Sequence, residues 1–335
     1  MSEPEALIEL QAISKRFTKR ADVVAKALNT VGGKHRDRTV HAVDEVDMTV
    51  APGEVVGLVG ESGCGKSTLG RVIAGLYEPS GGRLFYAGKE MDRLTPAERR
   101  QATIDIQMVF QDPMSSLNPR KRVIDTVGEA PVFHGLVPAA EKSAYVDEIL
   151  DRVGLDASYK QRLPHQFSGG QRQRIGIARA LAVKPKFLVC DEAVAALDVS
   201  IQAQILNLFM DLQEELALTY LFISHDLGVV HHIADRVVIM YLGRVVEEAP
   251  KAEVFAHPNH PYTKALLADV PRLDRRHQDF HPIRGELPSP IDPPPGCHFH
   301  PRCPLAFERC RVERPALKTV APGHKSACHL NDAAA

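Results

Sequence analysis

The sequence has almost no net charge and no long apolar run, and each absence excludes a class of protein. Its 335 residues include 41 Lys and Arg and 42 Asp and Glu, a formal net charge of -1. Disordered chains and non-specific nucleic-acid binders usually carry a marked charge excess, so neither class is expected. No run of about 18 consecutive apolar residues occurs, so no transmembrane helix is expected. The first ten residues, MSEPEALIEL, lack the basic and apolar regions of a signal peptide, so we expect a cytoplasmic chain.

The order of apolar segments predicts an α/β core. Short apolar runs bounded by turn residues predict buried strands at residues 55–59, 187–190 and 219–224. Residues 66–76 and 143–153 predict helices, the second with an apolar stripe at helical spacing. Strands that alternate with helices favour a parallel sheet. Residues 237–248 predict a hairpin that turns near Gly243.

Two segments flanking this core differ in composition. Residues 7–17 and 43–50 alternate imperfectly between apolar and polar residues, as edge or half-buried strands do. Residues 18–40 between them are rich in Lys and Arg and predict an inserted surface loop or short helix. Contact of this insertion with lipid headgroups or a partner is the alternative. Beyond about residue 257, Pro, His, Arg and Cys become frequent, which predicts a core of residues 1–256 and a separate C-terminal extension of residues 257–335.

A phosphate-binding loop is predicted where the first buried strand ends. Residues 60–68, GESGCGKST, match G-x-x-x-x-G-K-[ST] between a predicted strand and a predicted helix. Glycines let backbone N–H groups point inward, and the helix dipole adds positive charge at the phosphates. Lys66 is predicted to reach the β- and γ-phosphates, and the Ser67 hydroxyl to bind Mg²⁺. The predicted nucleotide-binding residues of the loop are Gly60, Ser62, Gly63, Cys64, Gly65, Lys66, Ser67 and Thr68.

Two adjacent carboxylates, Asp191 and Glu192, follow the apolar run FLVC. With a phosphate loop upstream, Asp191 suits Mg²⁺ binding and Glu192 suits a general base that polarises the attacking water. The alternative is a helix N-cap whose acidic groups the helix dipole stabilises.

These motifs, together with the segment FSGGQR at residues 167–172, resemble the ABC ATPase cassette over about residues 7–255. The resemblance implies an α/β P-loop fold: a RecA-like core, an antiparallel β subdomain and a helical signature subdomain at about residues 112–182. It also implies that two cassettes hold ATP between them. Ser168 is a good helix N-cap, and a glycine-rich helix N-terminus suits an anion.

The resemblance further implies roles for residues outside the phosphate loop. Phe17 would stack on adenine, and Gln111 would lie near Mg²⁺ and report the nucleotide state. His225 would contact the γ-phosphate and help hold the attacking water, and Asp198 would lie in the loop that crosses the dimer interface. The signature residues would complete the ATP site of the opposing subunit: Ser168, Gly169, Gly170 and Gln171.

Two further segments, QDPMSSLNPR at residues 111–120 and HPNHPYTKALL at residues 257–267, resemble the oligopeptide and dipeptide importer ATPases. This implies a peripheral ATPase at the cytoplasmic face of the cell membrane. Its partners would be two transmembrane permease subunits, an extracytoplasmic solute-binding protein and a second ATPase, either related or identical. The alternatives are an importer of another solute, such as nickel or a sugar, and a soluble ABC ATPase acting on ribosomes or DNA. A near-zero charge and a single phosphate loop disfavour the last.

Four of the six cysteines gather in the tail, at Cys297, Cys303, Cys310 and Cys328. In a reducing cytosol such a group is more often a metal site than a set of disulfides. Four thiolates suit tetrahedral Zn²⁺ or a [4Fe-4S] cluster. Zinc sites more often contain C-x2-C pairs, which are absent here, and the family resemblance implies the iron–sulfur cluster. Zinc and thiols without a metal, free or disulfide-bonded, are the alternatives.

Overall fold

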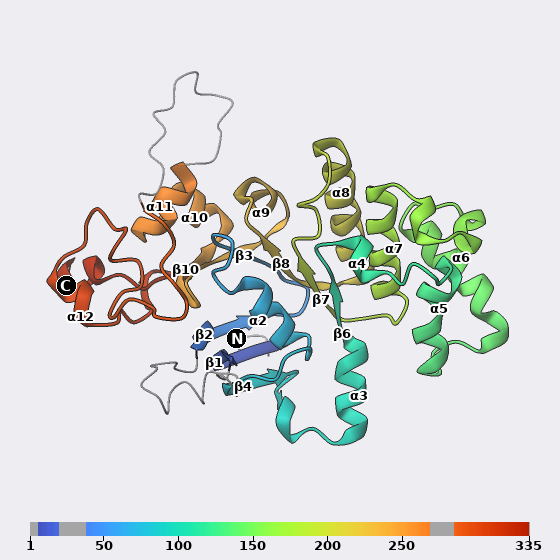
Figure 1. Cartoon of the computed structure of the whole chain (residues 1–335), viewed down its shortest axis with the longest axis horizontal. Helices are drawn as coiled ribbons and strands as arrows, with labels where there is room; N and C mark the ends of the chain where they lie inside the picture. The colour runs from blue at the N-terminus through green and yellow to red at the C-terminus, as the bar shows by residue number, and fades with distance from the viewer. Residues whose placement is uncertain (1–5, 20–37, 269–284, 335) are drawn as a thin grey trace, which may run out of the picture.

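The computed structural model describes residues 6–19, 38–268 and 285–334, which form two β-sheets and the helices around them (Figure 1). A four-stranded antiparallel sheet has the order β2-β1-β4-β5, and an eight-stranded sheet has the order β11-β12-β10-β9-β3-β8-β7-β6. The strands are β1 (Ile8–Lys19), β2 (Arg38–Val50), β3 (Val55–Val59), β4 (Gly81–Tyr86), β5 (Lys89–Glu90), β6 (Ile106–Val109), β7 (Phe187–Asp191), β8 (Thr219–Ser224), β9 (Arg236–Tyr241), β10 (Arg244–Pro250), β11 (Lys318–Ala321) and β12 (His324–Ser326). The helices are α2 (Lys66–Ile73), α3 (Pro96–Asp105), α4 (Pro113–Ser116), α5 (Val123–Phe133), α6 (Lys142–Arg152), α7 (Gly169–Leu181), α8 (Val199–Leu216), α9 (Leu227–Ile233), α10 (Lys251–Ala256), α11 (Pro261–Ala268) and α12 (Glu308–Val312).

Five neighbouring strands of the large sheet, β9, β3, β8, β7 and β6, run parallel. Every residue of β3, β7 and β8 is buried. Strands of a parallel sheet are covered on both faces, and continuous apolar runs are their typical sequence. The three predicted buried strands are therefore confirmed, as is the predicted hairpin, which β9 and β10 form.

Two hydrophobic cores lie on opposite faces of the large sheet. One core joins the small antiparallel sheet to α2, with Ile8, Leu58 and Leu69 fully buried. The other core joins helices α5 to α9 to the sheet through residues such as Ile175 and Phe209. The sheet is thus held between an antiparallel β layer and a helical layer, and the phosphate loop lies at its centre.

Helices α5, α6 and α7 pack on one another at the end of the molecule opposite the C-terminal tail (Figure 1). The predicted apolar stripe of α6, which includes Val146 and Leu150, is buried against its neighbours. The helix predicted at residues 66–76 ends earlier, at Ile73, because Gly75 adopts a left-handed conformation (φ 71°) that terminates it.

The bounds predicted for the insertion, residues 18–40, are wrong at both ends. Residues 18, 19 and 38–40 extend β1 and β2, and the strands pair as far as Lys19 opposite Arg38. Residues 20–37 lie outside the described residues. These strand ends lie at the exposed end of the small sheet and are mostly polar, so they lack the apolar alternation that predicts a strand.

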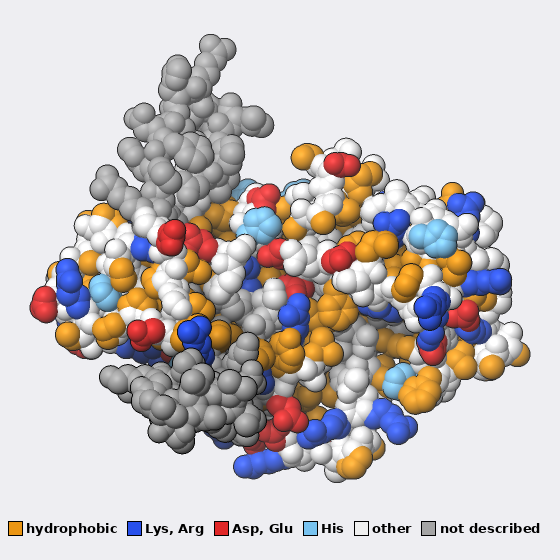
Figure 2. All heavy atoms as spheres, in the orientation of Figure 1, with side chains coloured by type: hydrophobic (Ala, Val, Ile, Leu, Met, Phe, Trp, Pro, Cys, Tyr) orange, Lys and Arg blue, Asp and Glu red, His pale blue; other side chains and the backbone are white. Residues whose placement is uncertain are grey.

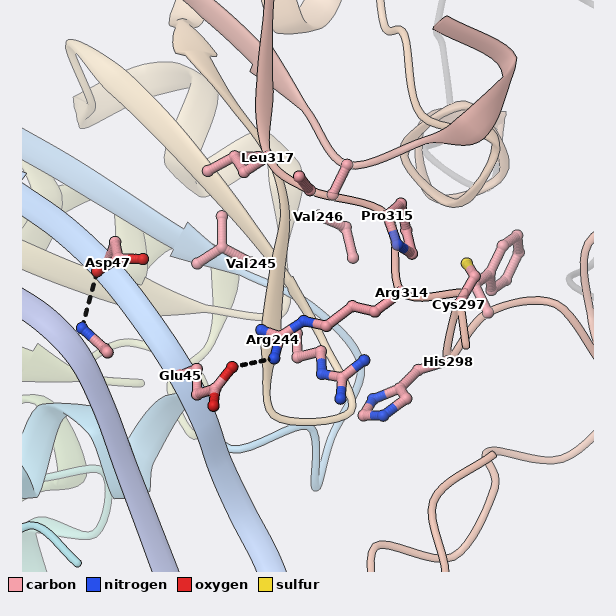
Figure 3. A pocket seen from close by; sticks show the side chains of 14 residues that line it. Glu45, Asp47, Arg244, Val245, Val246, Cys297, His298, Arg314, Pro315 and Leu317 are labelled. Atoms are coloured by element: carbon pink, nitrogen blue, oxygen red, sulfur yellow. Dashed lines mark hydrogen bonds and ion pairs between the residues drawn. The ribbon is translucent and has the colours of Figure 1, made fainter. Parts of the chain in front are cut away.

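The C-terminal tail continues the large sheet. Strand β12 pairs with β10, and β11 pairs with β12. A pocket of about 450 Å³ lies where the tail meets β2 and β10, and Arg314 of the tail forms an ion pair there with Glu45 (Figure 3). The tail is therefore built onto the cassette by backbone hydrogen bonds and ion pairs.

The surface in Figure 2 carries both signs of charge, with Lys and Arg interspersed among Asp and Glu, in keeping with the net charge of -1. None of the helices in the described ranges is long and apolar enough to cross a membrane.

Candidate active site

The phosphate loop connects β3 to α2, and its glycines allow very close backbone contacts. Gly65 has a φ of 108°, and a Cβ on it would lie 2.0 Å from the carbonyl oxygen of Ala42. A Cβ on Gly60 would lie 2.1 Å from the carbonyl oxygen of Met240. Side chains at these two positions would overlap the backbone of neighbouring strands. The loop conformation therefore requires glycine there.

Lys66 spans the inside of the loop. Its side chain is 3% exposed, and Nζ donates hydrogen bonds to the carbonyl oxygens of Gly60 at 2.7 Å and Glu61 at 3.1 Å. Cys64 is buried beside it, with Sγ 3.9 Å from Nζ, and burial raises the pKa of this thiol above its ordinary value. Cys64 therefore packs as a small neutral residue, while the Lys66 ammonium supplies positive charge.

Ser67 and Asp191 place two side-chain oxygen groups next to each other beside the loop. The Ser67 hydroxyl donates a 2.6 Å hydrogen bond to Asp191 Oδ1, and Arg71 Nη2 lies 3.7 Å from Oδ2. Asp191 is 1% exposed, and burial raises the pKa of its carboxyl group above its ordinary value. A hydroxyl and a carboxylate are ligands that Mg²⁺ prefers, so the pair fits this ion.

Three neighbouring parallel strands deliver Gln111, Glu192 and His225 to one point. Gln111 Nε2 donates a 2.6 Å hydrogen bond to Glu192 Oε2, and His225 Nδ1 lies 3.5 Å from Glu192 Oε1. These residues follow β6, β7 and β8, whose carboxyl ends meet at the same edge of the sheet. Glu192 has a left-handed φ of 46°, a conformation that costs energy in a residue other than glycine.

The alternative interpretation of the Asp191–Glu192 pair, a helix N-cap, is wrong. A turn follows Glu192, and the next helix, α8, begins only at Val199. Instead, the carboxylate of Asp191 accepts from Ser67 at the start of α2, and that of Glu192 accepts from Gln111.

A pocket of about 420 Å³ lies over the phosphate loop. Its lining comprises Phe17, Val40, Ala42, Ser62, Gly63, Gly65, Lys66, Ser67, Thr68, Gln111, Glu192 and Pro290. Phe17 is 38% exposed, and its ring meets Tyr77 edge to face at 5.4 Å between centroids. Val40 was missed by sequence reasoning because only the pairing of β1 with β2 places it opposite Phe17.

The signature residues lie away from this pocket. Ser168 caps α7 in a reciprocal arrangement with Gln171, so its prediction as an N-cap is confirmed. Ser168 and Gly169 are exposed, and so is Asp198, the N-cap residue of α8. Within the described residues, none of the signature residues, nor Asp198, lines the pocket.

The four tail cysteines surround one small cavity. Cys297, Cys303, Cys310 and Cys328 line it together with His260, His300 and His329, and all four thiols are free. Burial raises the pKa of Cys297 to about 11 and the pKa of Cys303 above its ordinary value.

This cavity, about 10 Å³, has room for one water molecule. Across residues 6–19, 38–268 and 285–334, no group of three or more His, Cys, Asp or Glu side chains is arranged to hold a metal ion. The donor chemistry therefore suits a metal group, but the present spacing does not form a single-ion site. Neither the predicted iron–sulfur cluster nor the zinc alternative is supported by a formed ligand group in these ranges.

The strand–loop–helix geometry, the Ser67–Asp191 pair and the carboxylate of Glu192 together define a P-loop nucleotide hydrolase. Comparison with known proteins makes this specific. The family "ABC transporter" matches residues 43–195, and the family "Oligopeptide/dipeptide transporter, C-terminal region" matches residues 246–310.

Curated relatives cover nearly the whole chain. The oligopeptide transport ATP-binding protein AppF of Bacillus subtilis (strain 168) is 47% identical over 330 residues, 97% of this chain and 98% of the relative. The dipeptide transport ATP-binding protein DppF of Haemophilus influenzae is 49% identical over 297 residues, 88% of this chain and 90% of the relative. The chain therefore belongs to the ABC transporter ATPases, in the oligopeptide/dipeptide transporter family.

Solved structures agree with this assignment. The structure of cbiO1 from Clostridium perfringens, part of an ABC transporter complex, matches with a TM-score of 0.61 and 30% identity, covering 76% of this chain and 92% of that one. The ATP-binding cassette MJ0796, in a dimeric post-hydrolysis state with ADP and phosphate, matches with a TM-score of 0.62 and 27% identity, covering 73% and 98%. The predicted α/β ABC cassette fold is confirmed.

Proposed function

We propose that this chain binds and hydrolyses ATP to power an importer of oligopeptides or dipeptides. The observation that carries the hydrolytic part is the contact of Glu192 with Gln111 and His225 beside the phosphate loop. The names of the curated relatives and the matching C-terminal family support a peptide as the solute.

The geometry supports separate roles for the residues of the site in phosphate binding, Mg²⁺ binding and activation of water. Lys66 would bind the β- and γ-phosphates, and Ser67 and Asp191 would hold Mg²⁺ with Gln111 nearby. Mg²⁺, when bound, neutralises phosphate charge. Glu192 would accept hydrogen bonds from the attacking water and draw off its proton, with Gln111 and His225 fixing its side chain. The left-handed backbone of Glu192 supports this role, because strained residues that are held in place often serve a site.

Phe17 would supply the adenine platform, because its half-exposed ring lies on the rim of the same pocket. The signature residues Ser168–Gln171 and Asp198 would face the partner cassette. The exposure of Ser168, Gly169 and Asp198 supports this, as does the absence of all five residues from the described lining of this pocket. ATP would then stabilise a closed pair of cassettes, and hydrolysis would remove the bridging γ-phosphate and let them open. We propose that the partner is a related second ATPase.

The permease side is proposed to contact the helical subdomain. Met114, in the segment that follows Gln111, is 44% exposed, and Phe133 at the end of α5 is 82% exposed. Apolar side chains exposed in this way suit a contact with two permease subunits. The chain would thus be attached peripherally to the cytoplasmic face of the membrane, with an extracytoplasmic binding protein delivering the solute.

We also propose the division into an ATPase domain at residues 1–256, with its helical subdomain at about 112–182, and an extension at 257–335. Within the extension, Cys297, Cys303, Cys310 and Cys328 are proposed to hold a [4Fe-4S] cluster. Their convergence on one cavity and their free thiols support it. Each of the four cysteines would supply one thiolate to the cluster.

The function is tested by expressing the chain with its permeases, reconstituting the complex in liposomes, and adding a binding protein loaded with peptide, nickel or sugar. We expect ATP hydrolysis to rise with the peptide-loaded protein alone. Stimulation by nickel or sugar would overturn the solute assignment. Copurification of the chain with ribosomes or DNA in place of permeases would overturn the importer function.

The cluster is tested by anaerobic purification of the full chain. We expect a brown protein containing iron and acid-labile sulfide, and loss of both in Cys303→Ser but not in the buried-core control Cys190→Ala. A colourless protein with stoichiometric zinc, or with neither metal, would overturn the cluster.

A further inference from the structure

The side chain of Arg302, one residue before Cys303 in the tail, reaches into the phosphate loop. Its Nη1 and Nη2 atoms donate to Glu61 Oε2 at 2.6 Å and to Glu61 Oε1 at 2.9 Å. Glu61 is the second residue of the phosphate loop. The Arg302 side chain is 6% exposed and the Glu61 side chain 26%, so this two-pronged ion pair is partly shielded from water. An ion pair of this kind is stronger and more directional than a surface one.

All three polar groups of Glu61 are occupied, and two of them by the C-terminal part of the chain. Its N–H donates to the hydroxyl of Tyr262 at 2.9 Å, and its carbonyl oxygen accepts from Lys66 Nζ at 3.1 Å. Its carboxylate accepts from Arg302. Glu61, whose carbonyl oxygen accepts from the Lys66 ammonium, is therefore itself fixed by α11 and by the cysteine-bearing tail.

Arg302 rests on a rigid aromatic platform. Its guanidinium carbon lies 5.9 Å from the ring centre of Tyr241. Tyr241, Tyr262 and Phe299 form a buried cluster with ring centroids 4.7 to 5.3 Å apart. These rings come from the end of β9, from α11 and from the tail. Packing of this kind leaves few rotamers open to Arg302, so its guanidinium holds the carboxylate of Glu61 in one position in the loop.

The ion pair also removes a charge from the loop. Without Arg302, the carboxylate of Glu61 would be an unpaired negative charge in a segment that must bind a polyanion, and at partial burial such repulsion is substantial. We propose that Arg302 is a positioning residue of the ATP site: it fixes and neutralises Glu61, so the tail sets the affinity of the phosphate loop for nucleotide. The inference rests on the proposed ATP site and is independent of the solute.

The pair is tested with a double-mutant cycle on the full-length chain, with the dissociation constant of Mg·ATP as the readout. Arg302→Met leaves Glu61 charged and unpaired, and we expect a loss of affinity of about tenfold or more. Glu61→Gln removes the charge, and we expect less than a threefold change. The double variant should bind like Glu61→Gln, because no charge is left to neutralise.

Arg309→Met is the matched control. Arg309 is another tail arginine with two carboxylate partners, Glu313 and Asp332, but it lies on α12. We expect unchanged ATP affinity. The inference is overturned if Arg302→Met weakens binding equally in the Glu61→Gln background, or if Arg309→Met weakens it as much.

Folding does not confound the cycle. If Arg302→Met lowers the thermal unfolding temperature, Arg302→Lys serves as a second variant, because it keeps the charge without the two-pronged geometry. We expect its affinity for Mg·ATP to be intermediate. An affinity equal to that of Arg302→Met would overturn the charge argument. Failure of the unsubstituted chain to bind ATP would overturn the proposed function, whereas equal affinities among the variants would overturn only this inference.

Discussion

The side-chain amide of Gln111 donates a 2.6 Å hydrogen bond to the carboxylate of Glu192, and so joins the ends of β6 and β7. The donor is a neutral amide, which orients the carboxylate and leaves it able to accept a proton. His225 lies on the other side, 3.5 Å from Glu192 Oε1. The carboxylate is thus held from both sides by neighbouring strand ends, which is the arrangement a general base requires.

Glu192→Gln should therefore separate ATP binding from hydrolysis. The substitution keeps the size of the side chain but removes its ability to take a proton, so we expect hydrolysis to fall by at least about 10². The dissociation constant of ATP should change little. The measurement is phosphate release beside nucleotide titration on the same preparation.

Glu214→Gln, on the exposed side of α8, is the matched control for this substitution and should leave hydrolysis unchanged. Full turnover by Glu192→Gln would show that another group activates the water.

Gly65→Ala should damage the phosphate loop far more than Gly63→Ala. Both glycines have positive φ, at 108° and 82°, so alanine is strained at either position by about 1 kcal/mol. Only at Gly65 would the added Cβ lie 2.0 Å from a backbone oxygen, whereas nothing lies within 4 Å of a Cβ at Gly63. We expect ATP binding to be lost in Gly65→Ala and only weakened in Gly63→Ala. Equal losses of ATP affinity in the two variants would mean that the strain of positive φ, and not overlap of the Cβ with the backbone, accounts for the effect.

The parts of the fold predictable from sequence are those in which a local pattern carries a whole element. The apolar run 55–59 is buried at every position, and the glycine-rich turn after it is the phosphate loop. Ser168 has the local partner it needs, Gln171, three residues away, so its capping role is visible in the sequence. Such features depend on neighbours in the chain.

The missed features depend on residues far apart in the chain. Strands β11 and β12 have four and three residues, too short for alternation to indicate them, and exist because β10 offers a free edge. Glu61 and Arg302 are 241 residues apart, and no local pattern links them. Pro290 lines the nucleotide pocket only because the tail returns to β2, where its carbonyl accepts from His41 N.

Phe17→Ala should weaken binding of ATP but not of inorganic triphosphate. Stacking of an aromatic ring on a base contributes about 1–3 kcal/mol, which corresponds to roughly 5- to 150-fold in affinity. Triphosphate uses the phosphate loop alone, so its affinity should stay the same. Competition titrations against a fluorescent nucleotide measure both. Equal weakening of the two ligands would show that Phe17 supports the loop through Tyr77 and does not contact adenine.

Ser168→Arg should abolish hydrolysis in the assembled transporter and leave the ATP affinity of the isolated chain unchanged. The residue is exposed and lies outside the described lining of its own pocket, so its proposed target is the partner's nucleotide. Ser158→Arg, also exposed in the helical subdomain, is the matched control and should keep hydrolysis. A weakened affinity in the isolated Ser168→Arg chain would show that the signature acts within its own subunit.

Glu247→Gln should destabilise the whole chain, because this carboxylate joins the cassette to the tail. Glu247 is fully buried and accepts hydrogen bonds from the N–H groups of Asn259 and His260, while His324 Nε2 of the tail lies 2.7 Å from Oε1. An amide would turn an NH₂ group toward at least one of these donors and leave it unsatisfied. We expect a loss of about 1–3 kcal/mol in the free energy of unfolding, measured by urea denaturation, against no loss in Glu214→Gln. A single transition shifted as a whole would show that tail and cassette unfold together, and an unchanged midpoint would show that the joint contributes nothing to stability.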